Sequence, residues 1–443
     1  MSLLGIAWRN IRQRALTSSL TALSMALGVA LVVTTLVTGG VVKQAFESGA
    51  GLGYNMIVGA KGSPLQLVLN SVYLISKPIE NISWDTYTAF LPAAERADGT
   101  DGIWAASTQT AVPICMGDYY RGHRVVGTNA AYFDRLSRGD GQPFAFSSGE
   151  NFRDDDRYAA VIGSQVADTL DIAVGDAIAP THGADDGKVH DPFRVVGILA
   201  RTDTPVDRGV FVNMEGFYLQ DGHAKPVAAA PADEGTENEG ADEAAAAAPG
   251  DGRLPYSQRE VTAILLETAA LPGLPAELTA MGLRNAINEG RDAQAALPIA
   301  EIRVLLDLFV TPLELLFLLV TTLVVIVSSI GILVSMVGSA LERSRDVAIM
   351  RALGARRRVV LATVLIEAIL LAAVGGGCGW LLGHGVVGLI GPWIATNAGV
   401  TAGFLSFTPA EALLVPFLIV LAILAALLPA VAAYRTDVAR WLG

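Results

Sequence analysis

Few residues of this 443-residue chain have the types and spacing that chemistry at a site requires. Histidine occurs at positions 123, 182, 190, 223 and 384, without the spacing of a metal-ligand motif and without a nearby cysteine. His182 and His190 border an acidic loop, THGADDGKVHD, which could hold a metal weakly, but we expect a solvated loop instead. No serine–histidine–acid or paired-carboxylate pattern stands out. The sequence therefore predicts no catalytic residue, no bound cofactor and no metal site.

The segment GAKGS invites comparison with a phosphate-binding loop. The Walker spacing needs four residues between the first glycine and Gly-Lys-Ser/Thr, whereas here Lys61 precedes Gly62. The two cysteines also suggest no reactive site, because Cys115 lies in an acidic block and Cys378 in an apolar run. We expect both to be packing residues.

The most informative polar stretch is residues 341–360, LERSRDVAIMRALGARRRVV, with six arginines and two acids. It lies between two long apolar runs, and a charged segment cannot sit in hydrocarbon, so it must lie in water. Ile349 and Leu353 stand four apart, and Gly354 follows where a helix commonly ends. This pattern predicts a short amphipathic helix that docks on a protein or lies on anionic lipid.

Four apolar runs are long enough to cross about 30 Å of hydrocarbon as helices. The first run is too long for the apolar core of a signal peptide, so we interpret it as a retained anchor. The predicted transmembrane helices span 16–42, 308–340, 359–390 and 413–433.

Charge is sorted along the chain. Residues 43–307 hold 20 basic and 37 acidic side chains, whereas 1–15, 341–358 and 434–443 together hold eleven arginines and three acids. By the positive-inside rule the basic pieces stay in the cytoplasm and the acidic block crosses. The chain is therefore predicted to be an α-helical membrane protein. Its four transmembrane helices carry a mixed α+β extracytoplasmic domain between the first and the second.

The polar segments outside the domain complete this topology. Residues 1–15 are predicted to form a cytoplasmic amphipathic helix, residues 391–412 a short extracytoplasmic loop, and residues 434–443 a cytoplasmic tail. Because the one large polar domain is acidic, nucleic acid is not an expected partner.

The domain at 43–307 is predicted to be rich in short strands. Its candidate strands include VPICMG, HRVVGTN, AAVIGS, VGDAIAP, FRVVGILA and GVFVNM, and YNMIVGAKGSPLQLVLNSVYLIS reads as strand-like around a Gly-Ser-Pro turn. Residues 203–208, DTPVDR, are interpreted as a structural loop. Residues 226–252 are acidic and rich in Ala, Gly and Pro, which predicts a disordered insert.

Three residues within the third apolar run merit attention. Glu367 is a candidate functional residue, because a carboxylate in a membrane is costly unless it faces protein or water. We favour a helix–helix hydrogen bond, or a contact with the basic cytoplasmic end. Gly379 and Gly383 have the small-xxx-small spacing that lets helices approach closely, so we predict a packing surface, with a dimer as one option.

Several of these stretches resemble a known family. LERSRDVAIMRALGARRR, preceded by VVIVSSIGILVSMVGSA and followed by VVLATVLIEAILLAAVGGGCGWLLGH, closely resembles the FtsX-like permease domain of type VII ABC transporters. This group contains the macrolide exporter and the lipoprotein-releasing permeases. ALLPAVAAYRTDVARWL is similar to its closing helix and LLGIAWRNIRQRALTSSLTALSMALGVAL to its opening helix. ILARTDTPVDRGVFVNM and VIGSQVADTLDIAVGDAI are similar to its periplasmic domain.

The resemblance implies that 341–358 is a coupling helix that docks on a separate ATPase subunit. It also implies a two-lobed periplasmic domain, with an inserted lobe at about 112–225, and it matches the family's intramembrane glutamate to Glu367. The insert at 226–252 departs from the family pattern. The expected docking residues, with Met350 added from the apolar side of the helix, are Glu342, Arg343, Asp346, Ile349, Met350, Arg351, Ala352, Leu353 and Gly354.

The function implied is that of a permease subunit in the bacterial inner membrane that couples ATP hydrolysis to periplasmic conformational change. ATP and Mg would be held by the partner ATPase, because this sequence shows no ATPase motif. The mechanotransmission would serve export or extraction of a lipid-linked, peptide or drug-like substrate. Alternatives are a signalling subunit that regulates a periplasmic cell-wall hydrolase, and a sensor without transport.

The partners follow from the same resemblance. We expect an ABC ATPase, membrane lipids, and a homodimer or a heterodimer with a related permease. A periplasmic adaptor or an outer-membrane protein is a further option.

Overall fold

The computed structural model describes residues 2–49, 52–138, 141–183, 187–223, 254–342, 356–398 and 403–434. The chain divides into two compact units, one formed by Met1–Gln44 with Leu306–Gly443 and the other by Ala45–Leu305. We call them the helical unit and the α/β unit. Each has its own hydrophobic core, and each is described by itself.

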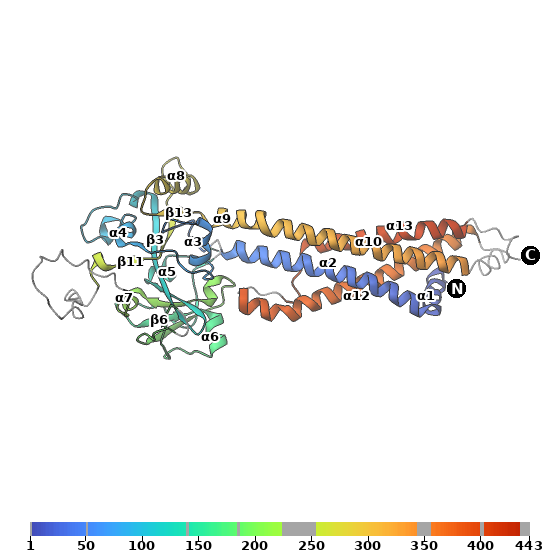
Figure 1. The fold of residues 1–443 in the computed structure, drawn as a ribbon, viewed down its shortest axis with the longest axis horizontal. Coiled ribbons are helices and arrows are strands. Elements are labelled where there is room, and N and C mark those ends of the chain that lie inside the picture. The colour runs from blue at the N-terminus through green and yellow to red at the C-terminus, as the bar shows by residue number, and fades with distance from the viewer. Residues whose placement is uncertain are drawn as a thin grey trace, which may run out of the picture. The chain divides into compact units, whose positions relative to one another are not determined.

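The helical unit contains four helices that are long and apolar enough to cross a membrane, as the sequence predicts (Figure 1). The candidate spans within the described residues are Ala15–Gln44, Pro298–Gly331, Arg358–Ile394 and Pro409–Leu427. The helices of this unit are α1 (Leu3–Gln13), α2 (Ala15–Gly49), α10 (Thr311–Glu342), α12 (Arg357–Ala398) and α13 (Leu414–Tyr434). A π-helical turn, η5 (Leu306–Val310), leads into α10, and a 3-10 turn, η6 (Pro409–Leu413), leads into α13.

Small and branched apolar residues form the core of the helical unit. On α2 the buried Met25, Val29, Val33 and Val37 recur every four residues, which places them along one face of the helix. They pack with small residues of the other helices, and small residues let helix backbones approach closely. These partners include Ala368, Ala372, Ala422 and Ala426.

The α/β unit is built on one mixed sheet (Figure 1). Among the described residues the sheet has eleven strands, with the path β13-β1-β12-β3-β4-β10-β6-β9-β5, while β7 pairs with β9 and β8 with β3. The β10–β4 and β6–β9 pairs are parallel, and the other pairs are antiparallel. The strands are β1 (Met56–Gly59), β3 (Thr108–Tyr120), β4 (His123–Thr128), β5 (Phe146–Gly149), β6 (Ala159–Ile162), β7 (Ala177–Ile178), β8 (Thr181–His182), β9 (Phe193–Leu199), β10 (Val210–Asn213), β12 (Ala263–Thr268) and β13 (Gln294–Ala296).

Short helices and one small ribbon complete the α/β unit. The ribbon pairs β2 (Ile82–Ser83) with β11 (Glu260–Val261). The helices are α3 (Pro64–Ser71), α4 (Trp84–Thr88), α5 (Ala131–Asp134), α6 (Ser164–Leu170), α7 (Met214–Tyr218), α8 (Ala276–Glu289) and α9 (Pro298–Leu305). Strands of the predicted inserted lobe, 112–225, and of the flanking segments join in the same sheet through the β12–β3 pair. The predicted insert at 226–252 lies outside the described residues.

One expectation about this unit is wrong. The segment after the Gly-Ser-Pro turn is the helix α3, and only Met56–Gly59 before the turn is a strand. The Ser63 side chain accepts a hydrogen bond from Gln66 N, and Pro64 occupies the first helical turn, where its missing N–H costs nothing. Leu67 and Val68 are buried, so a short apolar run that could suit a strand is here a buried helix face.

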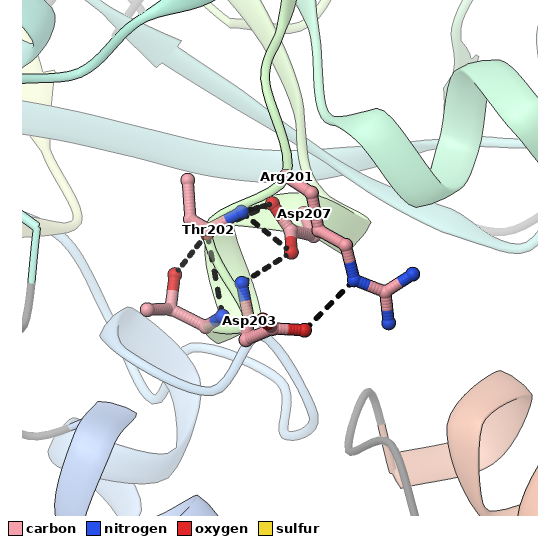
Figure 2. A network of polar contacts seen from close by, with 5 residues as sticks. Arg201, Thr202, Asp203 and Asp207 are labelled. Atoms are coloured by element: carbon pink, nitrogen blue, oxygen red, sulfur yellow. Dashed lines mark hydrogen bonds and ion pairs between the residues drawn. The ribbon is translucent and has the colours of Figure 1, made fainter.

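The loop DTPVDR is held together by its own carboxylate, as Figure 2 shows. Asp207 is buried and accepts hydrogen bonds from Thr202 N at 3.0 Å, Thr202 Oγ1 at 2.8 Å and Asp203 N at 2.8 Å. Asp203 has φ 53°, and its exposed side chain pairs with Arg201 at 2.8 Å. The Asp207 carboxylate thus stabilises the conformation of this loop, as expected of a structural loop.

Candidate functional site

The predicted docking segment connects the end of α10 to the start of α12. Glu342 is the last residue of α10, and α12 begins at Arg357. The two helices therefore determine where the segment begins and ends. The other predicted docking residues lie outside the described residues: Arg343, Asp346, Ile349, Met350, Arg351, Ala352, Leu353 and Gly354.

Glu367 is buried on α12 and contacts the N-terminal helix. Asn10 Nδ2 on α1 donates a hydrogen bond to Glu367 Oε2 at 3.4 Å. The Ser2 hydroxyl caps α1 by accepting from Gly5 N, and Ala7 is buried where α1 packs on α12. A buried carboxylate needs such a donor, so Glu367 connects the amphipathic first helix to the third span.

Gly379 and Gly383 lie where α12 crosses α2. A Cβ atom on Gly379 would come within 2.4 Å of the Ala26 carbonyl oxygen and 2.7 Å of Val29 Cβ. A Cβ atom on Gly383 would come within 2.7 Å of Val33 Cβ. Only a residue without a side chain fits so close an approach, so these glycines form a helix crossing inside the chain.

A second polar cluster in the helical unit surrounds Glu411, and the sequence does not predict that its members meet. Glu411 Oε2 accepts from Trp380 Nε1 at 3.1 Å and lies 2.9 Å from Nε2 of the fully buried His384. Its other oxygen accepts from Thr408 N and Oγ1 at 2.7 and 3.0 Å, which completes a capping box at the start of η6. The Thr-x-x-Glu spacing is visible in the sequence, whereas the contact with His384 depends on how α12 and η6 pack.

A third cluster lies in the α/β unit, where Asp118, His182, His190 and His223 bring their ligand atoms together. The expected solvated loop fits His182, whose side chain is 47% exposed, but it is wrong for His190, whose side chain is 1% exposed. The sequence does not reveal this cluster because its members come from three separate segments. Three of the chain's five histidines meet there.

Two family models match the chain in the order of its parts. The MacB-like periplasmic core domain matches residues 18–248, and the FtsX-like permease C-terminal domain matches residues 318–438. The first match begins within α2 and extends through most of the α/β unit. The second covers most of α10, all of α12 and α13, and the predicted docking segment between α10 and α12.

Curated relatives agree with these matches over short stretches. The macrolide export ATP-binding/permease protein MacB of Brucella abortus (strain 2308) is 38% identical over 90 residues, which is 20% of this chain and 13% of that protein. The same-named protein of Hahella chejuensis is 41% identical over 76 residues, 17% of this chain and 12% of that one. The uncharacterised ABC transporter permease YvrN of Bacillus subtilis (strain 168) is 43% identical over 60 residues, 14% and 15% of the two chains.

The alignments thus cover at most 15% of the length of these relatives. The two family models together match parts of both the helical unit and the α/β unit. The chain belongs to the FtsX-like, MacB-like family of type VII ABC transporter permeases with a periplasmic core domain.

Proposed function

We propose that this chain is the permease subunit through which a separate ABC ATPase moves a domain on the far side of the inner membrane. The observation that carries the proposal is the order of its parts. The FtsX-like match covers three candidate membrane helices, the first two of which are joined by a charged segment, and the periplasmic-domain match precedes it. The subunit would work as a dimer with itself or with a related permease. ATP and Mg would bind to the partner.

The chain connections make a mechanical route available. The segment 341–358 would dock on the ATPase in the cytoplasm, together with both termini, while Ala45–Leu305 faces the periplasm. The chain enters the α/β unit from α2 and leaves it through α9 and η5 into α10, so a tilt of either helix would act on the connection that this helix forms. The spans carry few charges, which fits motion transfer better than a hydrophilic channel.

The substrate we propose is a lipid-linked, peptide or drug-like molecule taken from the membrane or the periplasm. Relatives named as macrolide export proteins support the drug-like class.

Charge reversal at Arg351 tests this proposal. Arg351→Glu places an acid in the middle of the docking segment, and we expect it to abolish co-purification of the ABC ATPase from solubilised membranes while the chain still inserts. A docking surface that binds an arginine is expected to present negative charge to it. Reversal of the arginine charge would therefore place like charges opposite each other in the interface. The measurement is the ratio of ATPase to permease in the purified complex.

The matched control is Arg194→Glu, which makes the same charge change at an exposed arginine of the α/β unit. This variant should retain the ATPase at the wild-type ratio. If Arg351→Glu retained the ATPase at the wild-type ratio, the proposal that 341–358 docks on the ATPase would be wrong.

A further inference from the structure

We propose that Asp118, His182, His190 and His223 form a binding site for a divalent transition metal of the zinc type. Each residue offers one ligand atom, and these atoms all lie within 4.8 Å of one another. All four belong to Ala45–Leu305. The site is therefore independent of the membrane helices and of the proposed coupling to an ATPase.

The β3–β8 pair and the turn after it bring three of the ligands to one place. Asp118 on β3 lies opposite His182 on β8 in antiparallel register, which puts the two side chains on one face of the sheet. The chain then folds back, because His182 N donates to Lys188 O at 2.9 Å and His190 N donates to Pro180 O at 2.8 Å. This return places His190 beside His182, with 5.5 Å between their ring centroids.

The fourth ligand comes from the segment after α7. The His223 ring packs against Phe217 of α7 with 4.2 Å between centroids, and it follows Gly222, whose φ of +89° favours glycine. Lys188 forms an ion pair with Asp221, which ties this segment to the turn that carries His190. The ligands are thus held by backbone and side-chain contacts outside the cluster.

The distances among Asp118 Oδ2, His190 Nε2 and His223 Nε2 match three edges of a tetrahedral metal site. Asp118 Oδ2 lies 3.1 Å from His223 Nε2 and 3.4 Å from His190 Nε2, and the two histidine nitrogens are 3.2 Å apart. His182 Nδ1 lies 3.3 Å from Asp118 Oδ1. A tetrahedron with metal–nitrogen bonds of about 2.0–2.1 Å has edges of about 3.3–3.4 Å.

Hydrogen bonding satisfies only part of this arrangement. Asp118 Oδ2 and the Nε2 atoms of His190 and His223 form a triangle, in which one imidazole can donate and the other can accept, depending on its tautomer. Within the described part of the chain, the buried Asp118 Oδ1 has no hydrogen-bond partner. A single cation could bind Asp118 Oδ2 and both Nε2 atoms at once, with a His182 nitrogen close enough to be the fourth ligand.

Three of the four ligands are shielded from solvent, and the His190 side chain is 1% exposed. The side chains of Asp118 and His223 are 1% and 6% exposed, which limits competition from water.

The donor set selects the class of metal. Three imidazole nitrogens and one carboxylate oxygen suit zinc, whereas calcium and magnesium prefer shells made of oxygen ligands. His182, the most exposed of the four, has the most freedom to adjust to an ion. His182 and His223 also line a cavity of about 400 Å³ with Cys115, Met116, Tyr218 and Glu260, so an ion would lie beside an open space. Bound metal would join β3, the β8 turn and the segment after α7.

Metal counting on the full chain tests this inference. The protein is purified in detergent with an affinity tag that contains no histidine, stripped with a chelator, incubated with Zn²⁺ and passed through a desalting column. We expect one zinc ion per chain by mass spectrometry of the metal, and a visible absorption band typical of tetrahedral coordination when Co²⁺ replaces Zn²⁺. Zn²⁺ should also raise the melting temperature of the protein.

Variants of the cluster and a matched control complete the test. His182→Ala and His190→Ala should each weaken Zn²⁺ binding by at least about 100-fold, since even loss of an outer-shell partner costs 10- to 100-fold. His182→Ala truncates a half-exposed side chain, so it remains informative if His190→Ala fails to fold. His123 is the one histidine of the α/β unit that is not in the cluster. His123→Ala should therefore bind Zn²⁺ like the wild type. Failure of the wild type to retain zinc, or equal retention by His182→Ala and the wild type, would overturn the inference.

Discussion

Replacing Gly379 by valine is expected to destabilise the helical unit by about 3 kcal/mol, which corresponds to a melting temperature lower by about 10 °C. A Cβ atom at this position would approach the Ala26 carbonyl oxygen to 2.4 Å and the Ala26 Cα to 3.0 Å. Both are backbone atoms, so the clash is relieved only if α12 and α2 separate. The separation would expose the packed row of Met25 and Val29. Thermal melting of the detergent-purified protein, followed by size-exclusion chromatography, measures the effect.

Gly385 provides the matched control for this prediction, because it lies on the same helix. Among the described residues no atom lies within 4 Å of a Cβ built at Gly385. Gly385→Val therefore makes the same exchange without the clash, and its effect should stay within about 0.5 kcal/mol. Equal losses at Gly379 and Gly385 would show that the helix crossing does not depend on the missing side chain.

Removing the buried charge of Arg259 is expected to cost the α/β unit about 3–5 kcal/mol. The Arg259 side chain is 3% exposed and donates two parallel hydrogen bonds, each 3.0 Å long, to the carboxylate of Glu215. Its Nε donates to Leu254 O at 2.7 Å, and its guanidinium lies 5.2 Å from the centroid of the Trp84 ring and 5.0 Å from that of Tyr256. Arg259→Met would leave the Glu215 carboxylate largely buried and unpaired.

A double variant separates the lost pair from the lost packing. Because most of the cost comes from the uncompensated carboxylate, Arg259→Met with Glu215→Leu should recover much of the stability lost in the single variant. Arg194→Met is the control, since the Arg194–Asp156 pair is exposed and its loss should cost about 0–1 kcal/mol. The measurement is near-ultraviolet circular dichroism during melting. A double variant less stable than Arg259→Met would contradict this explanation.

Arg259 also matters for the position of α7. Glu215 lies on α7, and the Tyr218 hydroxyl of the same helix donates to Glu260 O at 2.6 Å. These contacts tie α7 to the chain at 254–260, and α7 leads directly to His223. The stability of the Arg259–Glu215 pair and the placement of the proposed metal ligand are therefore connected.

The parts of this fold that the sequence predicts are those that depend on local pattern. Four long, predominantly apolar runs predict four spanning helices, because crossing a membrane requires a minimum helix length. Strands such as Phe193–Leu199 follow from their alternation and from β-branched residues. Pro64–Ser71 has only eight residues, which is too few for periodicity to distinguish a helix from a strand. The cap formed by Ser63 favours the helix at this position.

The polar clusters depend on tertiary structure, and the sequence shows them only in part. Asp118 and His223 are more than a hundred positions apart, and only the sheet register and the contacts of α7 bring them together. The contact between His384 and Glu411 likewise requires α12 to pass beside η6. Metal motifs readable from sequence rely on short spacing between ligands, which this cluster lacks.

The most direct test of the proposed coupling is a cross-link from the docking segment in intact cells. A photoreactive amino acid placed at Ala352 should form a covalent adduct with an ABC ATPase, identified by mass spectrometry. The same probe at Ala245, in the insert that we place on the opposite side of the membrane, should not capture that protein. An ATPase adduct from Ala352 alone is the predicted result. Capture of the ATPase from Ala245, or its absence from Ala352 in cells that contain the intact complex, would contradict the account.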